Sequence, residues 1–189
     1  MLPEVLQEVK KRGHAIFERG AWNLNLIGVR TPTLQSNLFD DHLHCVFKDD
    51  CGQWVDISFQ CTTDPGLYWL HNPMRSAGTA IMCPGQYRGA YKIGMHRKRY
   101  PALVQVKPVK VFRDRNRDEI LDMDPKTITE GLYGVNIHHS GESGSENVNR
   151  WSAGCTVLSN LNDWEVFLSI VRRSADTYGD RFTYTLIEK

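Results

Sequence analysis

The chain has 189 residues, of which 41% are hydrophobic and 24% are charged. These values are typical of a globular protein and argue against a disordered or fibrous one. A chain of this length suits one domain with a substantial core, so we expect residues 1–189 to form a single domain. Because 23 Lys and Arg are balanced by 22 Asp and Glu, no overall positive charge exists to hold nucleic acid.

An amphipathic helix is predicted over residues 3–19, within an N-terminal segment that ends at Gly20. Hydrophobic residues recur there at the spacing of one helical face, namely Leu2, Val5, Leu6, Val9, Ile16 and Phe17. The segment contains acidic residues and no continuous hydrophobic run, so it predicts neither a signal peptide nor a membrane span. On this basis we expect the protein to be cytoplasmic as made.

Short strands dominate the prediction from Ala21 onward, because brief hydrophobic stretches alternate with turn signals such as Asp-Pro-Gly and Asn-Pro. The predicted strands cover residues 22–30, 42–48, 53–59, 66–71, 79–83, 103–114, 133–139 and 181–189, and Pro108 divides 103–114 if that segment is a pair. A late helix is predicted at about 163–174, with Asn162 and Glu165 at capping-box spacing. The whole pattern predicts an α+β fold that is mainly β.

The five cysteines, Cys45, Cys51, Cys61, Cys83 and Cys155, form an odd set without regular spacing. Together with the missing signal peptide, this predicts free thiols in a reducing compartment and argues against a disulfide framework.

A polar loop separates His138 and His139 from Cys155. A thiolate is a good nucleophile when an imidazolium or backbone N–H groups stabilise it. Gly154 permits a sharp turn that would present the thiol at the rim of a sheet, and small neighbours let N–H groups form an oxyanion hole. The segment therefore suggests nucleophilic chemistry. The alternative is a buried filler cysteine beside solvated histidines, and spacing alone does not decide between the two.

The stretch IHHSGESGSENVNRWSAGCTVL resembles the signature of the L,D-transpeptidase catalytic domain (the YkuD-like family). In that signature a His is followed about fifteen residues later by Ser/Thr-His-Gly-Cys. The matching features are the Ile137-His138 pair, the spacing, Ser152, Gly154 and Cys155. Residues 61–70 also resemble the family's Thr-Pro-x-Gly turn, and the resemblance covers roughly residues 54–158.

The resemblance implies a β-sandwich and an enzyme acting on peptidoglycan stem peptides, with no cofactor required. Family members attack the diaminopimelate carbonyl of a stem tetrapeptide, release D-Ala, and pass the acyl group to an amine or to water. By resemblance, Cys155 is the nucleophile and His138 is the base that activates it and then protonates the leaving amine. Gly154 supplies an oxyanion N–H and Ser152 supports the loop.

Two positions depart from the family pattern. Ala153 stands where most members have a second His, and Val157 stands where an Arg or Asn usually follows. Both departures put recognition of the acyl donor in doubt. His139 is the rival base, but strand alternation turns it to the other face from His138. Trp151 precedes the predicted nucleophile and is expected to wall the cleft.

Ordinary family members are exported, whereas no signal peptide is predicted here. A phage-encoded lysis enzyme or virion component, released to the cell wall by another route, fits as well as a cytoplasmic recycling carboxypeptidase. Such settings favour water as the acceptor, and so hydrolysis. The alternative function is a non-catalytic wall-binding or virion structural module that keeps the fold.

Two further segments carry charged groups. Asp114, Asn116, Asp118 and Asp122 occupy four oxygen-ligand positions of an EF-hand-like loop, but Glu119 and Pro125 stand where Gly and a bidentate acid belong. They form a weak candidate for structural calcium, and a solvated turn is favoured over it. The segment 96–100, which contains Arg97, Lys98 and Arg99, is predicted to be a solvated basic loop.

Overall fold

The computed structural model describes residues 1–141 and 143–189. Its helices are α1 (Glu4–Lys11), α2 (Leu67–His71) and α3 (Leu161–Tyr178), with a short 3₁₀ turn, η1, at Pro125–Thr127. The strands are β1 (Asn25–Arg30), β2 (Asp41–Lys48), β3 (Trp54–Thr62), β4 (Thr79–Met82), β5 (Gly85–His96), β6 (Tyr100–Gln105), β7 (Val109–Asp114), β8 (Thr129–Gly131), β9 (Ile137–His139), β10 (Thr156–Leu158) and β11 (Phe182–Glu188). The prediction of a mainly β, α+β fold is confirmed.

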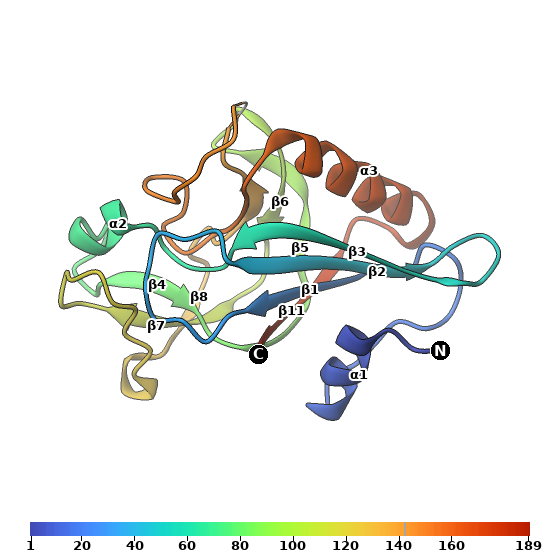
Figure 1. Cartoon of the computed structure of the whole chain (residues 1–189), viewed down its shortest axis with the longest axis horizontal. Coiled ribbons are helices and arrows are strands. Elements are labelled where there is room, and N and C mark those ends of the chain that lie inside the picture. Colours follow the sequence, from blue (N-terminus) through green and yellow to red (C-terminus); the bar gives the residue numbers. More distant parts are fainter. Residues whose placement is uncertain (142) are drawn as a thin grey trace.

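The strands form a closed barrel and a smaller sheet beside it (Figure 1). The order around the barrel is β1-β11-β5-β6-β9-β10-β3-β2, and the three-stranded sheet has the order β4-β7-β8. Most neighbouring strands are antiparallel, but β1 pairs with β11, and β9 with β10, in parallel. The parallel β9–β10 pair is decisive for the site, because it aligns residues from the two ends of the polar loop.

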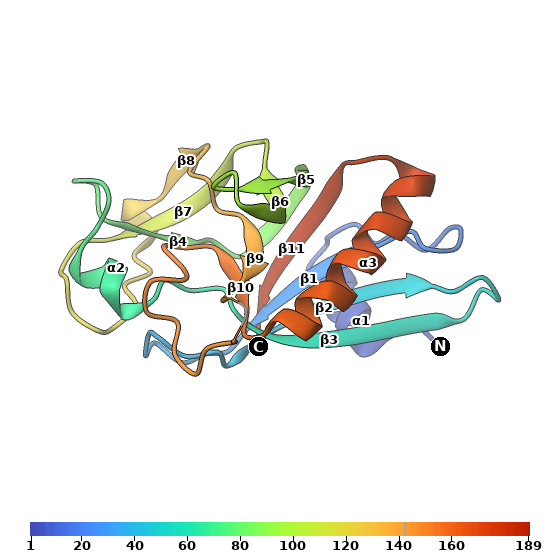
Figure 2. The same cartoon turned by 90° about the horizontal axis from the view of Figure 1, so that it is seen from above.

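The helices cover two different parts of the barrel (Figures 1 and 2). The buried stripe of α3, which includes Trp164, Phe167 and Val171, belongs to the main core with Phe47 and Phe59. Helix α1 packs Val5, Leu6 and Val9 against a separate cluster formed by β1, β2 and β11. None of the helices in the described part of the chain is long and apolar enough to span a membrane.

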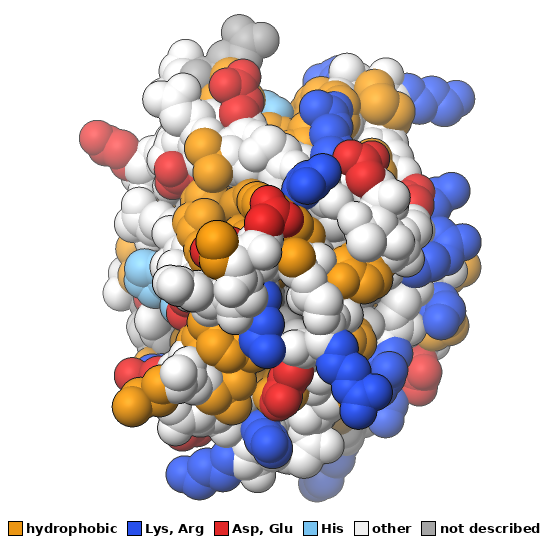
Figure 3. Space-filling view, turned by 90° about the vertical axis from the view of Figure 1, so that its right-hand side faces the viewer, with side chains coloured by type: hydrophobic (Ala, Val, Ile, Leu, Met, Phe, Trp, Pro, Cys, Tyr) orange, Lys and Arg blue, Asp and Glu red, His pale blue; other side chains and the backbone are white. Residues whose placement is uncertain are grey.

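On the face of the molecule shown in Figure 3, basic and acidic side chains occur together, with hydrophobic side chains scattered between them. This mixture on that face matches the nearly balanced charge of the sequence.

The N-terminal helix is shorter than predicted, because it ends at Lys11 and not near Gly20. Gly13 has a left-handed φ of +77°. The N–H groups of Gly13 and His14 donate to the carbonyls of Lys10 and Val9, which is a helix-terminating arrangement. The following chain runs along the barrel, where the N–H of Phe17 donates to Asn25 Oδ1 at 2.7 Å. A glycine inside a helical pattern therefore ends the helix.

Other elements also differ from the prediction, and the short strands β8 and β10 are absent from the predicted ranges. Residues 66–71, predicted as a strand, contain the short helix α2, since a brief hydrophobic run does not distinguish the two structures. Strand β5 is absent from the prediction, because its glycines and charged residues obscure the alternation. Helix α3 is longer than 163–174, and its N-cap is Asn160, whose Oδ1 accepts from the N–H of Asp163 at 2.9 Å. Segment 103–114 divides at Pro108 into β6 and β7, which lie in different sheets.

Arg30 joins the barrel to the smaller sheet through a buried network. Its side chain is fully buried, and Nη1 donates to the carbonyl of Met82, at the end of β4, at 2.9 Å. Nη2 donates to the Thr63 carbonyl at 3.1 Å, and Nε lies 3.0 Å from Asp64 Oδ1. Burial raises the pKa of Asp64 to about 7, and the charge of Arg30 opposes this shift. The positions of β4 and of the segment after β3 thus depend on one guanidinium.

Arg30→Gln is expected to lower the free energy of unfolding by about 3–5 kcal/mol, because it leaves a buried carboxyl and two buried carbonyls without their cation. Urea denaturation measures the loss. Arg12→Gln is the matched control, since Arg12 pairs with Glu8 at the surface, where ion pairs stabilise little. Equal, small losses in both variants would show that the network does not hold the two sheets.

Candidate active site

The parallel pairing of β9 and β10 brings the two ends of the polar loop together (Figure 2). His138 is in register with Val157, and Ile137 with Thr156. One residue earlier, the N–H of Thr156 donates to the Asn136 carbonyl at 3.0 Å. Side chains alternate along both strands, so Asn136, His138, Cys155 and Val157 lie on one face of the pair. His139 lies on the opposite face.

The Cys155 thiol lines a cavity of about 300 Å³. His96, Arg97, Tyr133 and Trp151 also line this cavity. Sγ accepts a hydrogen bond from the N–H of Asn136 at 3.4 Å and donates to the Gly134 carbonyl at 3.6 Å. Burial raises the pKa of Cys155 to about 11, although the Asn136 N–H and Arg97 act in the opposite direction. The resting thiol is therefore protonated at neutral pH.

His138 is a buried, neutral imidazole with one nitrogen in use. Nδ1 lies 2.9 Å from the His139 carbonyl and 3.1 Å from the Tyr100 hydroxyl. Because a carbonyl only accepts, Nδ1 carries the proton and Nε2 keeps its lone pair. Nε2 is buried and has no hydrogen-bond partner among the described residues. Burial, and then the charge of His96, lower the pKa of His138 to about 3.

The two predicted catalytic side chains share a face without being hydrogen-bonded to each other. Among the described residues, Sγ of Cys155 contacts Asn136 and Gly134, and no hydrogen bond joins it to His138. A direct Sγ–Nε2 hydrogen bond requires the thiol to turn away from the Gly134 carbonyl. The arrangement is a protonated thiol beside a neutral base, not a preformed ion pair.

His96 is a site residue that the sequence does not reveal. It ends β5, is 8% exposed, and lines the same cavity as Cys155. Its ring stacks on that of His138, with centroids 4.0 Å apart, and its Nδ1 lies 3.2 Å from Asn136 Nδ2. No sequence signal marks it, because the alternation of β5 is obscured. Arg97 also lines the cavity, so the basic segment is not entirely a solvated loop.

Gly154 and Ser152 shape the turn that precedes the thiol. Gly154 has a φ of +113°, and a Cβ at this position would lie 2.5 Å from the Ala80 carbonyl oxygen. Its N–H donates to Ser152 Oγ at 3.1 Å, and Ser152 Oγ donates to the Cys155 carbonyl at 2.8 Å. The Gly154 N–H is therefore occupied, and its expected oxyanion role requires this hydrogen bond to break. The N–H of Cys155 donates to no described residue.

His139 and Trp151 lie on different sides of the site. His139 Nδ1 accepts from the N–H of Gly141 at 3.0 Å, and its ring lies 4.4 Å from that of Tyr100 between centroids. Neither His139 nor His138 is among the described residues that line the thiol cavity. Trp151 does line it and is 40% exposed. Of the two imidazoles beside the loop, only that of His138 shares a strand face with the thiol.

The calcium candidate is a loop with internal hydrogen bonds. Asp114 Oδ2 accepts from the N–H of Asp122 at 3.0 Å, and Asn116 Nδ2 donates to Asp118 Oδ2 at 2.8 Å. Within residues 1–141 and 143–189, no group of three His, Cys, Asp or Glu side chains is placed to hold a metal ion. Structural calcium at these four residues stays an untested prediction.

In comparisons with known proteins, no family model, curated protein or solved structure matches the chain. Function is therefore inferred from the sequence motif and from the geometry of this site.

Gly154→Ala is expected to destabilise the protein more than Gly52→Ala does. Gly52 also has a positive φ, but no atom lies within 4 Å of the position that an added methyl group would take, so its substitution tests backbone strain alone, which costs about 1 kcal/mol. At position 154 the methyl group additionally meets the Ala80 carbonyl. Thermal unfolding of both variants measures the difference, and equal shifts would contradict this steric account.

Alkylation of Cys155 is expected to accelerate with pH. With a pKa near 11, the thiolate fraction rises about tenfold per pH unit between about pH 7 and 9. The rate is read with iodoacetamide in a Cys51→Ser background, because Cys51 is exposed, by mass analysis of the peptide that carries Cys155. A rate already constant near neutral pH would show a preformed thiolate.

Proposed function

We propose that the chain is a cysteine-dependent enzyme that acts on peptidoglycan stem peptides, and that its closed barrel and three-stranded sheet correspond to the β-sandwich of the L,D-transpeptidase-like fold. The observation that carries the proposal is the free Nε2 of His138, a buried base atom on the same strand face as the Cys155 thiol, which lines a cavity. A buried imidazole is costly to leave without a partner, so a proton-accepting role accounts for it. Hydrolysis is favoured over transfer to an amine.

The pKa order of the two groups suggests how the reaction starts. Because the pKa of Cys155 is raised and that of His138 is lowered, charge separation before attack is unfavourable. The thiol leaves the Gly134 carbonyl and gives its proton to His138 Nε2 as Sγ attacks the diaminopimelate carbonyl carbon. The Cys155 N–H is the donor proposed for the resulting oxyanion.

The remaining steps return the site to its starting state. Protonated His138 donates to the nitrogen of the departing D-Ala, the C–N bond breaks, and a thioester forms. His138 then takes a proton from water, the hydroxide attacks the thioester carbonyl, and Sγ leaves with the proton held by His138. No cofactor takes part in these steps. His96 is a positioning residue in this scheme, since its ring stacks on His138.

The two departures from the family pattern carry different weight. Val157 is fully buried among Phe39, Val148 and Cys155, so its side chain does not reach a substrate. Ala153 lines the thiol cavity together with His96. Alanine is smaller than the histidine that the family pattern has at this position, so the cavity is larger here. The cavity still contains one imidazole, that of His96 from β5.

One observation favours the alternative, a non-catalytic wall-binding or virion structural module. The resting thiol is protonated and is not hydrogen-bonded to His138. Either function requires the protein to reach peptidoglycan. A phage-encoded protein made in the cytoplasm would do so after its release to the cell wall. Neither requires nucleic acid or a membrane span.

Incubation of the purified protein with diaminopimelate-type tetrapeptide muropeptides tests the enzyme. Mass spectrometry should show loss of D-Ala, whereas cross-linked dimers would identify an amine acceptor. Cys155→Ser should abolish the product, and His138→Gln should slow its formation by about 10²–10⁴. His139→Gln, the matched imidazole on the other face, should have a much smaller effect.

If the folded protein leaves these muropeptides unchanged, the enzyme proposal is wrong. Cosedimentation with intact peptidoglycan then tests the wall-binding module. Circular dichroism of each variant confirms that it is folded before its rate is compared.

A further inference from the structure

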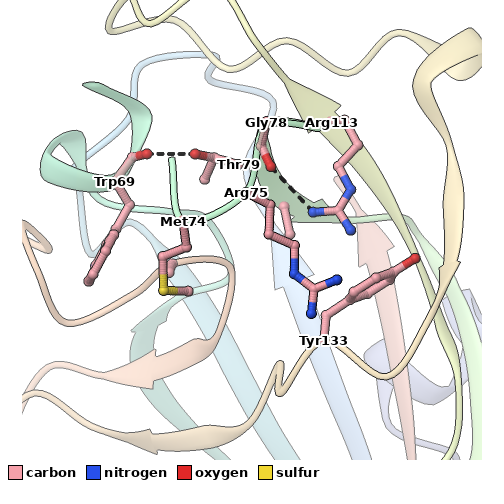
Figure 4. A pocket seen from close by; sticks show the side chains of 9 residues that line it. Trp69, Met74, Arg75, Gly78, Thr79, Arg113 and Tyr133 are labelled. Atoms are coloured by element: carbon pink, nitrogen blue, oxygen red, sulfur yellow. Dashed lines mark hydrogen bonds between the residues drawn. The ribbon is translucent and has the colours of Figure 1, made fainter. Parts of the chain in front are cut away.

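A second, smaller cavity adjoins the thiol cavity (Figure 4). Its accessible volume is about 40 Å³, and it shares Met74, Tyr133 and Ala153 with the thiol cavity. This volume is far below that of a pocket for a whole ligand, but it exceeds the space that one water molecule needs, so it suits a small group such as a carboxylate. Ala153 lines both cavities and precedes Cys155 by two residues. Two residues span at most about 7 Å of backbone, so the cavities meet close to Cys155.

Arg113 is held rigidly in the wall of this cavity. It is 5% exposed, its Nε donates to Thr129 Oγ1 at 3.0 Å, and its Nη1 donates to the Gly78 carbonyl at 3.3 Å. The guanidinium lies over the ring of Tyr133, 4.4 Å from the centroid. Nη2 donates no hydrogen bond to any described residue. This atom is not fully buried, so a ligand can reach it. One donor of a buried guanidinium therefore remains open.

Arg75 supplies a second positive charge near the same ring. Its guanidinium lies 5.7 Å from the Tyr133 centroid, and Figure 4 shows both guanidinium groups directed toward Tyr133. Among the described residues, no carboxylate lies within 4.0 Å of Arg75 or Arg113. Neither cavity has an Asp or Glu in its described lining, and Arg97 adds a further positive charge to the thiol cavity.

We propose that this cavity is a carboxylate-binding subsite for the peptide that Cys155 attacks, with Arg75 and Arg113 as its ligands. The inference rests on the proposed function and adds the substrate feature that the site selects. A buried, unpaired guanidinium favours an anion, and guanidinium groups match the planar geometry of a carboxylate. The small volume fits the carboxylate group itself.

The carboxylate has two chemical sources in a peptide, the C-terminal α-carboxylate and a side-chain carboxylate. Both have the same charge and planar shape, and they differ in the atoms next to the carboxyl group. Binding measurements with one ligand of each kind distinguish them.

The test is calorimetric titration of the full-length Cys155→Ser protein, which cannot turn substrate over. The probes are N-acetyl-D-alanine, its uncharged amide, and N-acetyl-D-glutamic acid α-amide, whose single carboxylate is in the side chain. We expect one acid to bind at least about tenfold more tightly than the amide, since a charged hydrogen-bonded pair contributes on the order of 1.5–3 kcal/mol. The acid that binds better identifies the source of the carboxylate.

Arg75→Gln should remove most of this preference and leave amide binding unchanged, and its exposed position makes misfolding a small risk. Arg113→Gln tests the buried partner. Arg172→Gln on α3 is the charge-matched control, because it removes one exposed positive charge away from both cavities. Equal binding of acids and amide, or an equal loss in all three variants, would overturn the subsite.

Failure of the subsite and failure of the enzyme are separable. A protein that releases D-Ala without preferring acids over the amide is an enzyme whose recognition lies elsewhere. If the protein binds the acid selectively but leaves muropeptides unchanged, the subsite proposal stands and the proposed reaction is wrong.

Discussion

The arrangement of the two sheets depends on a guanidinium placed where water cannot reach it. Arg30 contacts the end of β4 and the segment after β3 at once, and Asp41 holds that same segment by accepting from the N–H of Thr63 at 2.7 Å. Strand β4 then places the Ala80 carbonyl against Gly154. The buried charge of Arg30 is thus linked, through β4, to the turn at Gly154 that precedes Cys155.

Asn136 connects the groups that surround the thiol. Its backbone N–H contacts Sγ, its carbonyl accepts from Thr156, and its side chain contacts His96 and the N–H of Gln105. Its polar groups therefore have partners at the end of β5, in β6 and at the start of β10. Such a residue fixes the spacing of β6, β9 and β10, so the distance between thiol and imidazoles is set by strand pairing and not by the loop.

Burial explains the chemistry of the pair better than charge does. Desolvation is the largest cause of the raised pKa of Cys155 and of the lowered pKas of His138 and His96. All three groups are therefore neutral at pH 7. A neutral site has little tendency to react with small electrophiles in solution, and substrate contacts that turn the thiol toward Nε2 would then control its reactivity.

The sequence allows the fold class to be predicted, together with a thiol at the rim of a sheet and His138 and His139 on opposite faces of a strand, because alternation and loop composition are local properties. It does not allow His96, Arg75 or Arg113 to be recognised, since these residues reach the site through β5, β7 and the segment before β4. The predicted length of α1 is wrong because a hydrophobic stripe continues past Gly13. The oxyanion role expected of the Gly154 N–H stays a prediction, and it requires the hydrogen bond from this N–H to Ser152 Oγ to break.

Trp151 gives the site an optical property. It is the indole of the thiol cavity, it is 40% exposed, and its ring lies against Gly141. An indole that is partly in water emits at longer wavelength than one that is covered. Occupation of the cavity would therefore change the protein's own fluorescence, so binding can be followed without labelling any thiol.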